Sequence, residues 1–269
     1  LINKKARILI TTPNALMQFL PSRNDFLKNT VLLNKKVVLN QNEIVKQLLN
    51  SGYNKVDVVE DLGEFSTHGG ILDVFPLNLN KPVRIEFSEK SIIKFIKPFD
   101  VQSQHSDKKE LNSLKIIPAC EIMFNQENID FAREKLPEYR SKCSPEVLLR
   151  LRQSLQKKEA FPGIESLSPL FYPQLETLFD YFYNEFILII DDERNVNKRA
   201  ESFFQEVFME YEISTQQNKL TLSPESLFLS HRELQNKLKK HVRLILNSMT
   251  NDNTKSLEVH QLGFVDNKS

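Results

Sequence analysis

Glycine is scarce in this sequence, with six in 269 residues, and this scarcity limits the nucleotide sites that the chain could build. Three of the six, Gly63, Gly69 and Gly70, fall within the stretch GEFSTHGGILDVFP. A phosphate-binding P-loop needs Gly, four residues and then Gly-Lys-Ser/Thr, and a dinucleotide-binding fold needs Gly-x-Gly-x-x-Gly. Neither spacing occurs, and Ile71 stands where the P-loop lysine would follow the glycine pair. The sequence therefore contains no recognisable cradle for a nucleotide phosphate.

Cysteine, long apolar runs and excess charge are lacking as well. Cys120 and Cys143 are the only cysteines, too few for a disulfide framework and without the paired spacing of a zinc site, which favours a reducing compartment. No apolar run approaches the roughly 20 residues of a membrane span, and the start LINKKARILI is unlike a signal peptide, so we expect a cytoplasmic protein. Thirty-six basic and thirty-five acidic side chains argue against a dedicated nucleic-acid coat. Because the chain begins at Leu1 without methionine, we expect a piece of a longer protein.

The composition that remains, 40% apolar and 26% charged, is that of an ordinary globular protein. A strand over 6–10 and a helix with Thr12 as its N-cap and Pro13 at its first position are typical of an α/β fold. From residue 31 a new unit is expected, with extended segments at 31–33 and 37–39 and a helical stripe at 44–49 that ends at Gly52.

The apolar period changes to two between Lys55 and Ile117, which predicts a β-rich block. Its expected strands are 56–59, 71–75, 83–87 and 92–95. After Pro118 the helical period returns, with helices expected from Ser144, through 200–211, and from Ser223 to Leu238. A buried strand at 186–190 and further strands at 242–247 and 257–264 complete the pattern. The sequence thus predicts an α/β domain interrupted by a β-rich insertion.

Three groups of residues could have a chemical function, and each also has a purely structural interpretation. Asp191, Asp192 and Glu193 follow an apolar strand, as the magnesium-binding carboxylates of an ATPase do, but carboxylates at a strand exit more often cap the next helix. The basic run at 237–243 could touch phosphates, or could be a solvated helix C-terminus. No histidine pair shows the spacing of metal ligands, which disfavours a metal site. The histidines are His68, His105, His231, His241 and His260.

The middle block carries a resemblance to a known family. The runs GYNKVDVVEDLGEFSTHGGILDVFP, KPVRIEF, FDVQSQ and IIPACE, in this order, resemble the second domain of the bacterial transcription-repair coupling factors, the Mfd family. The flanks ILITTPNALMQFLP, GIESLSPLFYPQLETLFDYF and IIDDERN resemble the segments around that domain, least clearly after residue 212. The excision-repair protein UvrB is similar, but Asp100, Ser103 and Gln104 fit the coupling factors better.

The resemblance implies a fold and a role. It implies a degenerate RecA-like parallel-sheet domain, without ATPase motifs, at 1–30 and 119–269, interrupted by a β-rich α+β insertion domain at 31–118 that binds UvrA. In the family this UvrB-like module links stalled RNA polymerase to nucleotide excision repair, while separate motor domains use ATP and magnesium and move on DNA. We therefore expect a non-catalytic module without a cofactor of its own, whose contacts with RNA polymerase and DNA are made mainly by the rest of the protein.

The resemblance also places UvrA contacts at His68, Arg84 and Ser88. Gly63, Gly69 and Gly70 are expected in turns on their own account, because Gly69 and Gly70 permit backbone geometry that a side chain would block, at φ > 0 or at a close approach of strands. Alternation predicts Val83, Ile85 and Phe87 inward and Arg84, Glu86 and Ser88 outward. His68 stands where the family usually has arginine, Ser88 where it has an aromatic residue, and one extra residue falls between Ser88 and Phe99. The alternative for Arg84 is a surface ion pair with Asp73 or Glu86. A UvrB-type fragment, a nucleotide-binding degenerate motor and a DNA-contacting clamp remain alternative functions.

Overall fold

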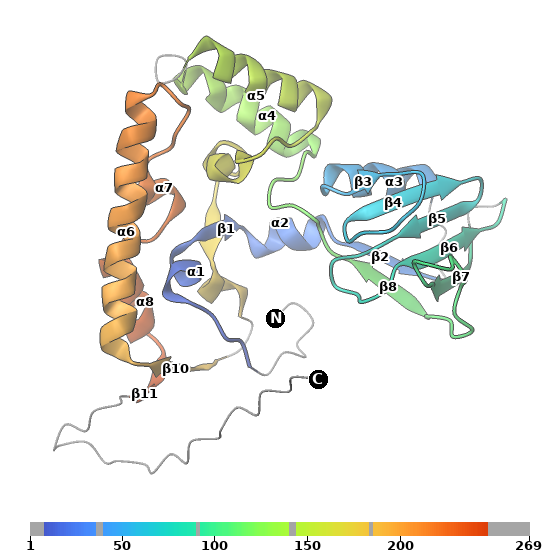
Figure 1. The fold of residues 1–269 in the computed structure, drawn as a ribbon, viewed down its shortest axis with the longest axis horizontal. Coiled ribbons are helices and arrows are strands. Elements are labelled where there is room, and N and C mark those ends of the chain that lie inside the picture. The colour runs from blue at the N-terminus through green and yellow to red at the C-terminus, as the bar shows by residue number, and fades with distance from the viewer. Residues whose placement is uncertain (1–7, 36–39, 90–91, 140–143, 183–184, 247–269) are drawn as a thin grey trace.

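The structure is a computed structural model, which describes residues 8–35, 40–89, 92–139, 144–182 and 185–246. It mixes helices and strands around three hydrophobic clusters. Figure 1 shows at one side the strands and the helix between Val31 and Ile116, which we call the sheet unit. The pair α4 (Gln126–Lys135) and α5 (Pro145–Lys157) lies above, and the long helix α6 (Glu193–Gln216) lies at the other side. A predicted segment at 37–39 and a predicted strand at 257–264 lie outside the described residues.

The strands are β1 (Phe19–Pro21), β2 (Val31–Asn34), β3 (Asn54–Lys55), β4 (Glu64–His68), β5 (Ile71–Val74), β6 (Val83–Phe87), β7 (Ile93–Pro98), β8 (Ser113–Ile116), β9 (Leu175–Thr177), β10 (Ile187–Asp191) and β11 (Val242–Leu246). The α-helices are α1 (Pro13–Met17), α2 (Arg23–Lys28), α3 (Gln41–Asn50), α4 (Gln126–Lys135), α5 (Pro145–Lys157), α6 (Glu193–Gln216), α7 (Pro224–Leu227) and α8 (His231–Lys239). Three 3-10 helices are η1 (Leu136–Tyr139), η2 (Ile164–Leu170) and η3 (Leu178–Tyr181).

The sheet unit contains a five-stranded sheet in the order β3-β4-β5-β6-β7, antiparallel except for the first pair. Side chains alternate along β6 as predicted, with Val83, Ile85 and Phe87 buried and the residues between them partly exposed. The buried side packs on α3 through Ile44 and Leu48 and on the β2-β8 pair. Period-two patterning therefore places one face in a core and leaves the other outward.

The glycines at the start of β5 serve the tight connection between β4 and β5. Gly69 has φ +58°, in the left-handed region that side chains rarely adopt, and Gly63 has φ +84°. Gly70 has ordinary backbone geometry, but a Cβ there would lie 3.1 Å from the Phe87 carbonyl oxygen of the neighbouring strand. The pair thus provides one left-handed turn and one close approach of two backbones.

A second close approach joins the sheet unit to the rest of the chain. The Gly52 backbone, at φ +83°, lies so near Cys120 that an added Cβ would be 2.5 Å from its Sγ. The Tyr53 hydroxyl donates to the Ile117 carbonyl at 2.8 Å, and Ala119 N–H donates to the Ser51 carbonyl at 2.8 Å. Residues 51–53, directly after α3, are therefore hydrogen-bonded and closely packed against residues 117–120, which leave the sheet unit, and we call this contact the α3 junction.

The segments on either side of the sheet unit pack together. β1 pairs antiparallel with β9, with Phe19 opposite Thr177, so residues before the sheet unit bond to residues after it. Met17, Phe179 and Ala200 share one buried cluster with residues of α8 and the segment before it. The chain thus leaves one packed region, forms the sheet unit and returns, although the proposed boundaries at 31 and 118 and the RecA-like assignment stay predictions.

Two predicted strands are wrong. Residues 8–10 form no strand and expose Ile8 and Ile10, because no described segment offers them a partner for backbone hydrogen bonds. Residues 56–59 form a bend, with Val58 exposed and Val59 buried, and only the preceding Asn54–Lys55 joins the sheet. An apolar run is therefore not sufficient for a strand.

The strand predicted at 186–190 exists as β10, but it is not buried. Ile187 and Ile189 are 68% and 67% exposed, and only Ile190 is buried. Within the described residues its single neighbour is β11, which is parallel to it. One face of this pair therefore has no cover from the described chain.

The single helix predicted from Ser223 to Leu238 is two helices, α7 and α8. Between them Phe228 bridges to Gln18, and Leu229 N–H donates to the Met17 carbonyl at 2.7 Å. A capping box then starts α8, because the Ser230 hydroxyl accepts from Glu233 N–H and the Glu233 carboxylate accepts from Ser230 N–H. The Ser-His-Arg-Glu sequence carries the signal for this break.

Across the described ranges, no helix has the length and apolarity to cross a bilayer.

Candidate docking face on the five-stranded sheet

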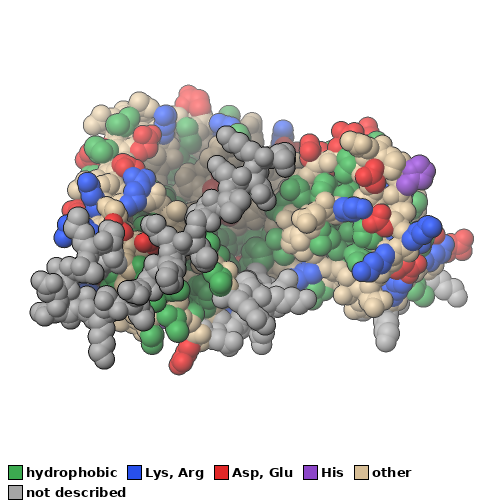
Figure 2. All heavy atoms as spheres, turned by 60° about the horizontal axis from the view of Figure 1, so that its bottom comes forward, with side chains coloured by type: hydrophobic (Ala, Val, Ile, Leu, Met, Phe, Trp, Pro, Cys, Tyr) green, Lys and Arg blue, Asp and Glu red, His purple; other side chains and the backbone are tan. Residues whose placement is uncertain are grey.

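The outward side of the five-stranded sheet, which we call the outer face, bears the residues that the sequence singled out. Strand pairing sets them in two rows across β4 to β7. The rows are Ser66, Asp73, Arg84 and Lys97, and beside it His68, Ile71, Glu86 and Phe95. Figure 2 shows basic and acidic side chains next to one another on the sheet unit, at the right.

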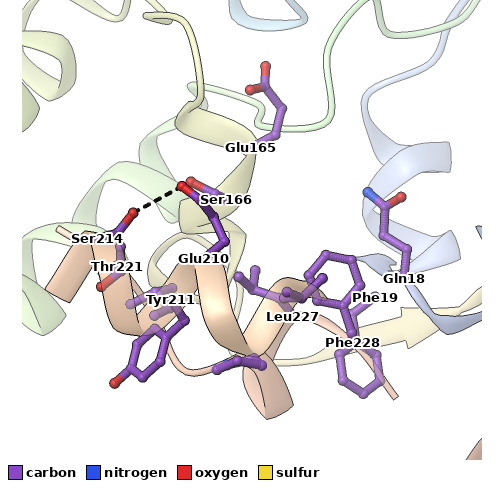
Figure 3. Close-up of a pocket in the computed structure, with 13 residues that line it drawn as sticks. Gln18, Phe19, Glu165, Ser166, Glu210, Tyr211, Ser214, Thr221, Leu227 and Phe228 are labelled. Carbon is purple, nitrogen blue, oxygen red and sulfur yellow. Dashed lines mark hydrogen bonds between the residues drawn. The ribbon is translucent and has the colours of Figure 1, made fainter. Parts of the chain in front are cut away.

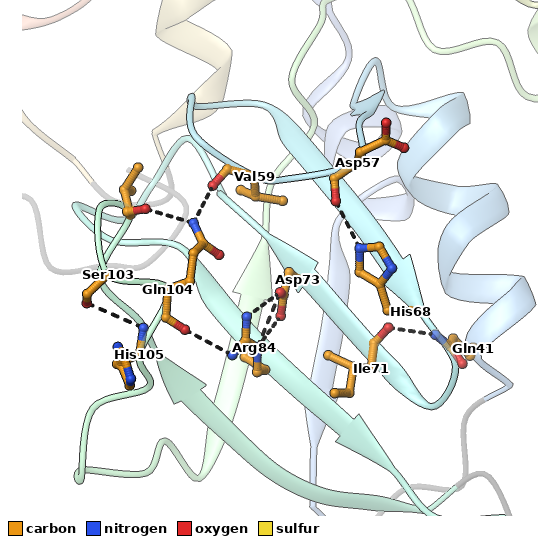
Figure 4. A network of polar contacts seen from close by, with 11 residues as sticks. Gln41, Asp57, Val59, His68, Ile71, Asp73, Arg84, Ser103, Gln104 and His105 are labelled. Carbon is orange, nitrogen blue, oxygen red and sulfur yellow. Dashed lines mark hydrogen bonds and ion pairs between the residues drawn. The ribbon is translucent and has the colours of Figure 1, made fainter.

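Arg84 is held in the middle of the outer face by three partners, of which Figure 4 shows Asp73 and Gln104. Its Nε and Nη2 donate to the carboxylate of buried Asp73 at 2.9 and 2.7 Å, and its Nη1 donates to the Gln104 carbonyl at 3.2 Å. The guanidinium also lies 4.9 Å from the centre of the Phe99 ring. The hydrogen bonds that Arg84 donates to the Asp73 carboxylate raise the pKa of Arg84 above its ordinary value. The predicted ion pair with Asp73 is therefore present, and Arg84 is a structural residue as well as an outward-facing one.

The loop after β7 explains why Asp100, Ser103 and Gln104 occur together. The Asp100 carboxylate accepts from the backbone N–H and the hydroxyl of Ser103, and the backbone N–H of Gln104 donates to the Asp100 carbonyl at 2.8 Å. Gln104 has φ 57°, which turns its carbonyl toward Arg84, and its side-chain amide donates to Val101 at 2.7 Å. This loop fixes the guanidinium from the side opposite Asp73.

His68 and Ser88 lie toward the end of the outer face where β4 turns into β5. His68 is exposed, and its Nε2 is 2.9 Å from the Asp57 carbonyl. Ser88 directly follows β6, and its hydroxyl accepts from Ile92 N–H at 3.2 Å. Strand pairing therefore places His68 and Arg84 on the outer face, and Ser88 lies just beyond the end of β6. The contact of these three residues with a partner stays a prediction.

The other sequence candidates have structural roles. Asp192 is the N-cap of α6, where its carboxylate accepts from Asn195 N–H at 3.1 Å, and Glu193 pairs with Arg243 at 3.3 Å. Lys237, in the basic run, pairs with Asp180 at 3.0 Å. The capping alternative is confirmed for Asp192, and Lys237 and Arg243 are engaged within the chain.

A pocket that no motif marked lies between η2, α6, α7 and β1 (Figure 3). It has a volume of about 400 Å³ and walls of Phe19, Val207, Leu227 and Phe228 among other side chains. Its walls come from four segments far apart in the sequence, so local spacing could not reveal it. In the described part of the chain, no three His, Cys, Asp or Glu side chains gather as metal ligands would.

Comparison with known proteins identifies the sheet unit. The profile of the family described as the UvrB interaction domain matches residues 31–121. The transcription-repair-coupling factor of Haemophilus influenzae is 32% identical over 249 residues, which are 90% of this chain and 21% of that protein. Its counterparts in Escherichia coli and Rickettsia bellii are each 29% identical, over 89% and 99% of this chain and 20% and 24% of theirs.

The chain thus spans about a fifth of the length of these relatives. The expected resemblance is confirmed: the chain is a relative of the transcription-repair coupling factors, similar to a UvrB-like part of them, and its residues 31–121 match the UvrB interaction domain.

Proposed function

We propose that the outer face of the five-stranded sheet binds UvrA, so that the chain serves as the recruitment module of a transcription-repair coupling factor. The observation that carries this proposal is the match of residues 31–121 to the UvrB interaction domain. The opposite face of the same sheet is occupied by α3 and the β2-β8 pair. On the outer face Ser66 and Asp73 are buried, so the part that can meet a partner is the row of His68, Ile71, Glu86 and Phe95 together with the edge of Arg84. Contacts of the whole protein with RNA polymerase and DNA belong to the same proposal.

The arrangement of Arg84 supports this role. The contacts to Asp73 and Gln104 use at most three of its five N–H donors, so two remain for an acidic partner. Because Asp73 and the loop hold the guanidinium in place, little side-chain entropy is lost on binding. Exposed His68 and partly exposed Ser88 extend the surface toward the β4-β5 turn.

Titration of this chain with UvrA from the same organism tests the proposal. Wild type is expected to bind saturably, and His68→Glu with Ser88→Glu to bind at least tenfold more weakly, because two like charges face an acidic partner. Arg232→Glu, an exposed position on α8, is the matched control and is expected to bind like wild type. Circular dichroism verifies folding. Absence of binding by wild type, or equal binding by the double variant, contradicts the proposal.

The proposal gives the chain no catalytic step of its own. It rests on the absence of a P-loop in the sequence and on the capping role of Asp192. Calorimetric titration with ATP and magnesium is expected to show no saturable binding tighter than about 100 μM, equivalent to roughly 5.5 kcal/mol. Turnover of ATP that Asp191→Asn abolishes would contradict this non-catalytic role.

A further inference from the structure

Phe95 is an aromatic side chain on the outer face and not in the core. It lies opposite Glu86 on β6, in the row that also contains His68. Its ring is partly exposed, and it does not belong to the described side chains that pack against the core of the sheet unit. An aromatic ring in this position is available to a partner.

A β-bulge sets the surroundings of this ring. Glu86 pairs with Phe95 but the next residue, Phe87, pairs with Ile93, so Lys94 has no opposing residue. The bulge falls between Ser88 and Phe99, where the sequence has one residue more than the family that it resembles. Bulges re-aim side chains, and here Lys94 Nζ lies 2.8 Å from the Glu86 carboxylate, beside Phe95. On the other side, Lys97 Nζ lies 4.6 Å from the centre of the Phe95 ring.

Two cations of this surface are more exposed than their partners. The side chain of Lys94 is 53% exposed and that of Glu86 29%, while Arg84 is 23% exposed and Asp73 7%. Lys97 is the reverse, 26% exposed against 39% for its partner Glu110. A protein approaching the outer face beside Phe95 therefore meets the Lys94 ammonium group before the Glu86 carboxylate. Exposed ion pairs of this kind are weak, so Lys94 can exchange its partner at small cost.

We propose that Phe95 is the apolar anchor of the docking face and that Lys94 and Lys97 flank it to recognise an acidic protein surface with a pocket for the ring. This inference rests on the proposed function, because the partner is taken to be UvrA. Its physical basis is that aromatic anchors ringed by polar contacts dominate the energetics of protein interfaces. The lysines add electrostatic attraction and exclude water from the ring.

The test uses the same titration with UvrA. Phe95→Ala is expected to weaken binding at least tenfold, whereas Phe95→Tyr, which keeps the ring, stays within threefold of wild type. Leu149→Ala is the matched control, because Leu149 is an exposed apolar side chain on α5, away from the sheet. Lys94→Glu is expected to slow association at low salt more than Lys81→Glu, which reverses another exposed lysine of the sheet unit.

The outcomes separate the two proposals. If wild type binds UvrA and the His68 and Ser88 double variant is weakened, but folded Phe95→Ala binds like wild type, the anchor is overturned and the docking function stands. If wild type does not bind UvrA at all, both are overturned. Thermal unfolding of each variant, followed by circular dichroism, establishes that a loss of binding is not a loss of folding.

Discussion

The five-stranded sheet and the parallel pair β10-β11 both contain apolar strands, but they differ strongly in how far those strands are exposed. In the five-stranded sheet, Leu72 and Ile85 are fully buried against α3 and the β2-β8 pair. In the parallel pair β10 and β11, the facing residues Ile187 and Val242, and next to them Ile189 and Leu244, remain exposed. The sequences are similarly apolar, so the difference lies in what covers each face. An apolar strand contributes to stability only where another element packs on it.

Truncating one apolar side chain in each sheet gives the largest contrast, because one is buried and the other is exposed. Leu72→Ala is expected to lower the free energy of unfolding by about 3 kcal/mol, because it leaves a cavity in a closed core. Ile189→Ala, which truncates an exposed side chain of similar size, is expected to change it by less than about 0.5 kcal/mol. Urea unfolding followed by circular dichroism measures both, and equal losses would mean that the exposed face is covered in solution.

Glycine substitutions compare the contact between Gly52 and Cys120 with the turn between β4 and β5 at Gly69. Gly52→Ala is expected to cost about 2 to 4 kcal/mol, because it adds a Cβ at positive φ and against Cys120. Gly69→Ala shares the positive φ but meets nothing within 4 Å, so about 1 kcal/mol is expected. The difference between the two unfolding free energies isolates the close contact. A Gly52→Ala protein as stable as the Gly69→Ala protein would disprove it.

The Arg84 pair separates folding from docking on the outer face. Arg84→Gln is expected to lower the free energy of unfolding by about 2 kcal/mol, because buried Asp73 loses its counter-charge. Adding Asp73→Asn is expected to restore most of that loss, because no unpaired charge then remains. Both variants lack the guanidinium, so both should bind UvrA weakly if Arg84 contacts it. Restored stability together with wild-type binding would remove Arg84 from the docking face.

The smallest expected effect on stability is the pH dependence caused by Cys120, which packs against Gly52. Burial first, and then the charge of Glu165, raises the pKa of the Cys120 thiol to about 12. The folded chain therefore holds a proton that the unfolded chain releases near pH 9, so this contribution to stability is complete below about pH 9 and declines as the pH rises toward 12.

A thiol-reagent assay measures this effect with Cys143→Ser, in which Cys120 is the single thiol. At pH 8 the folded protein is expected to react at least tenfold more slowly than the urea-unfolded protein, because the thiolate is the nucleophile. Equal rates would show that the contact between Cys120 and Gly52 does not shield the thiol from solvent in the folded protein.

Several elements could be predicted from local patterning alone. Alternation along 83–87 predicted which side chains face the core, and the glycine pair predicted the β4-β5 turn. Thr12 was expected to cap a helix and does so. Quoted motifs in the middle block pointed to the family that the comparisons confirm over residues 31–121. These features are local because each depends on neighbours along the chain or on the order of short runs in it.

The cover of each apolar run and the pairing of polar groups depend on contacts between segments that are distant in the sequence. The exposure of Ile189, the bend at 56–59 and the absence of a strand at 8–10 depend on partners that are distant in sequence. Arg84 could be placed outward from its period, but its bonds to Asp73 and Gln104 require three segments to converge. Burial and hydrogen bonding are settled between segments, because a chain cannot encode locally which distant group will exclude water from it.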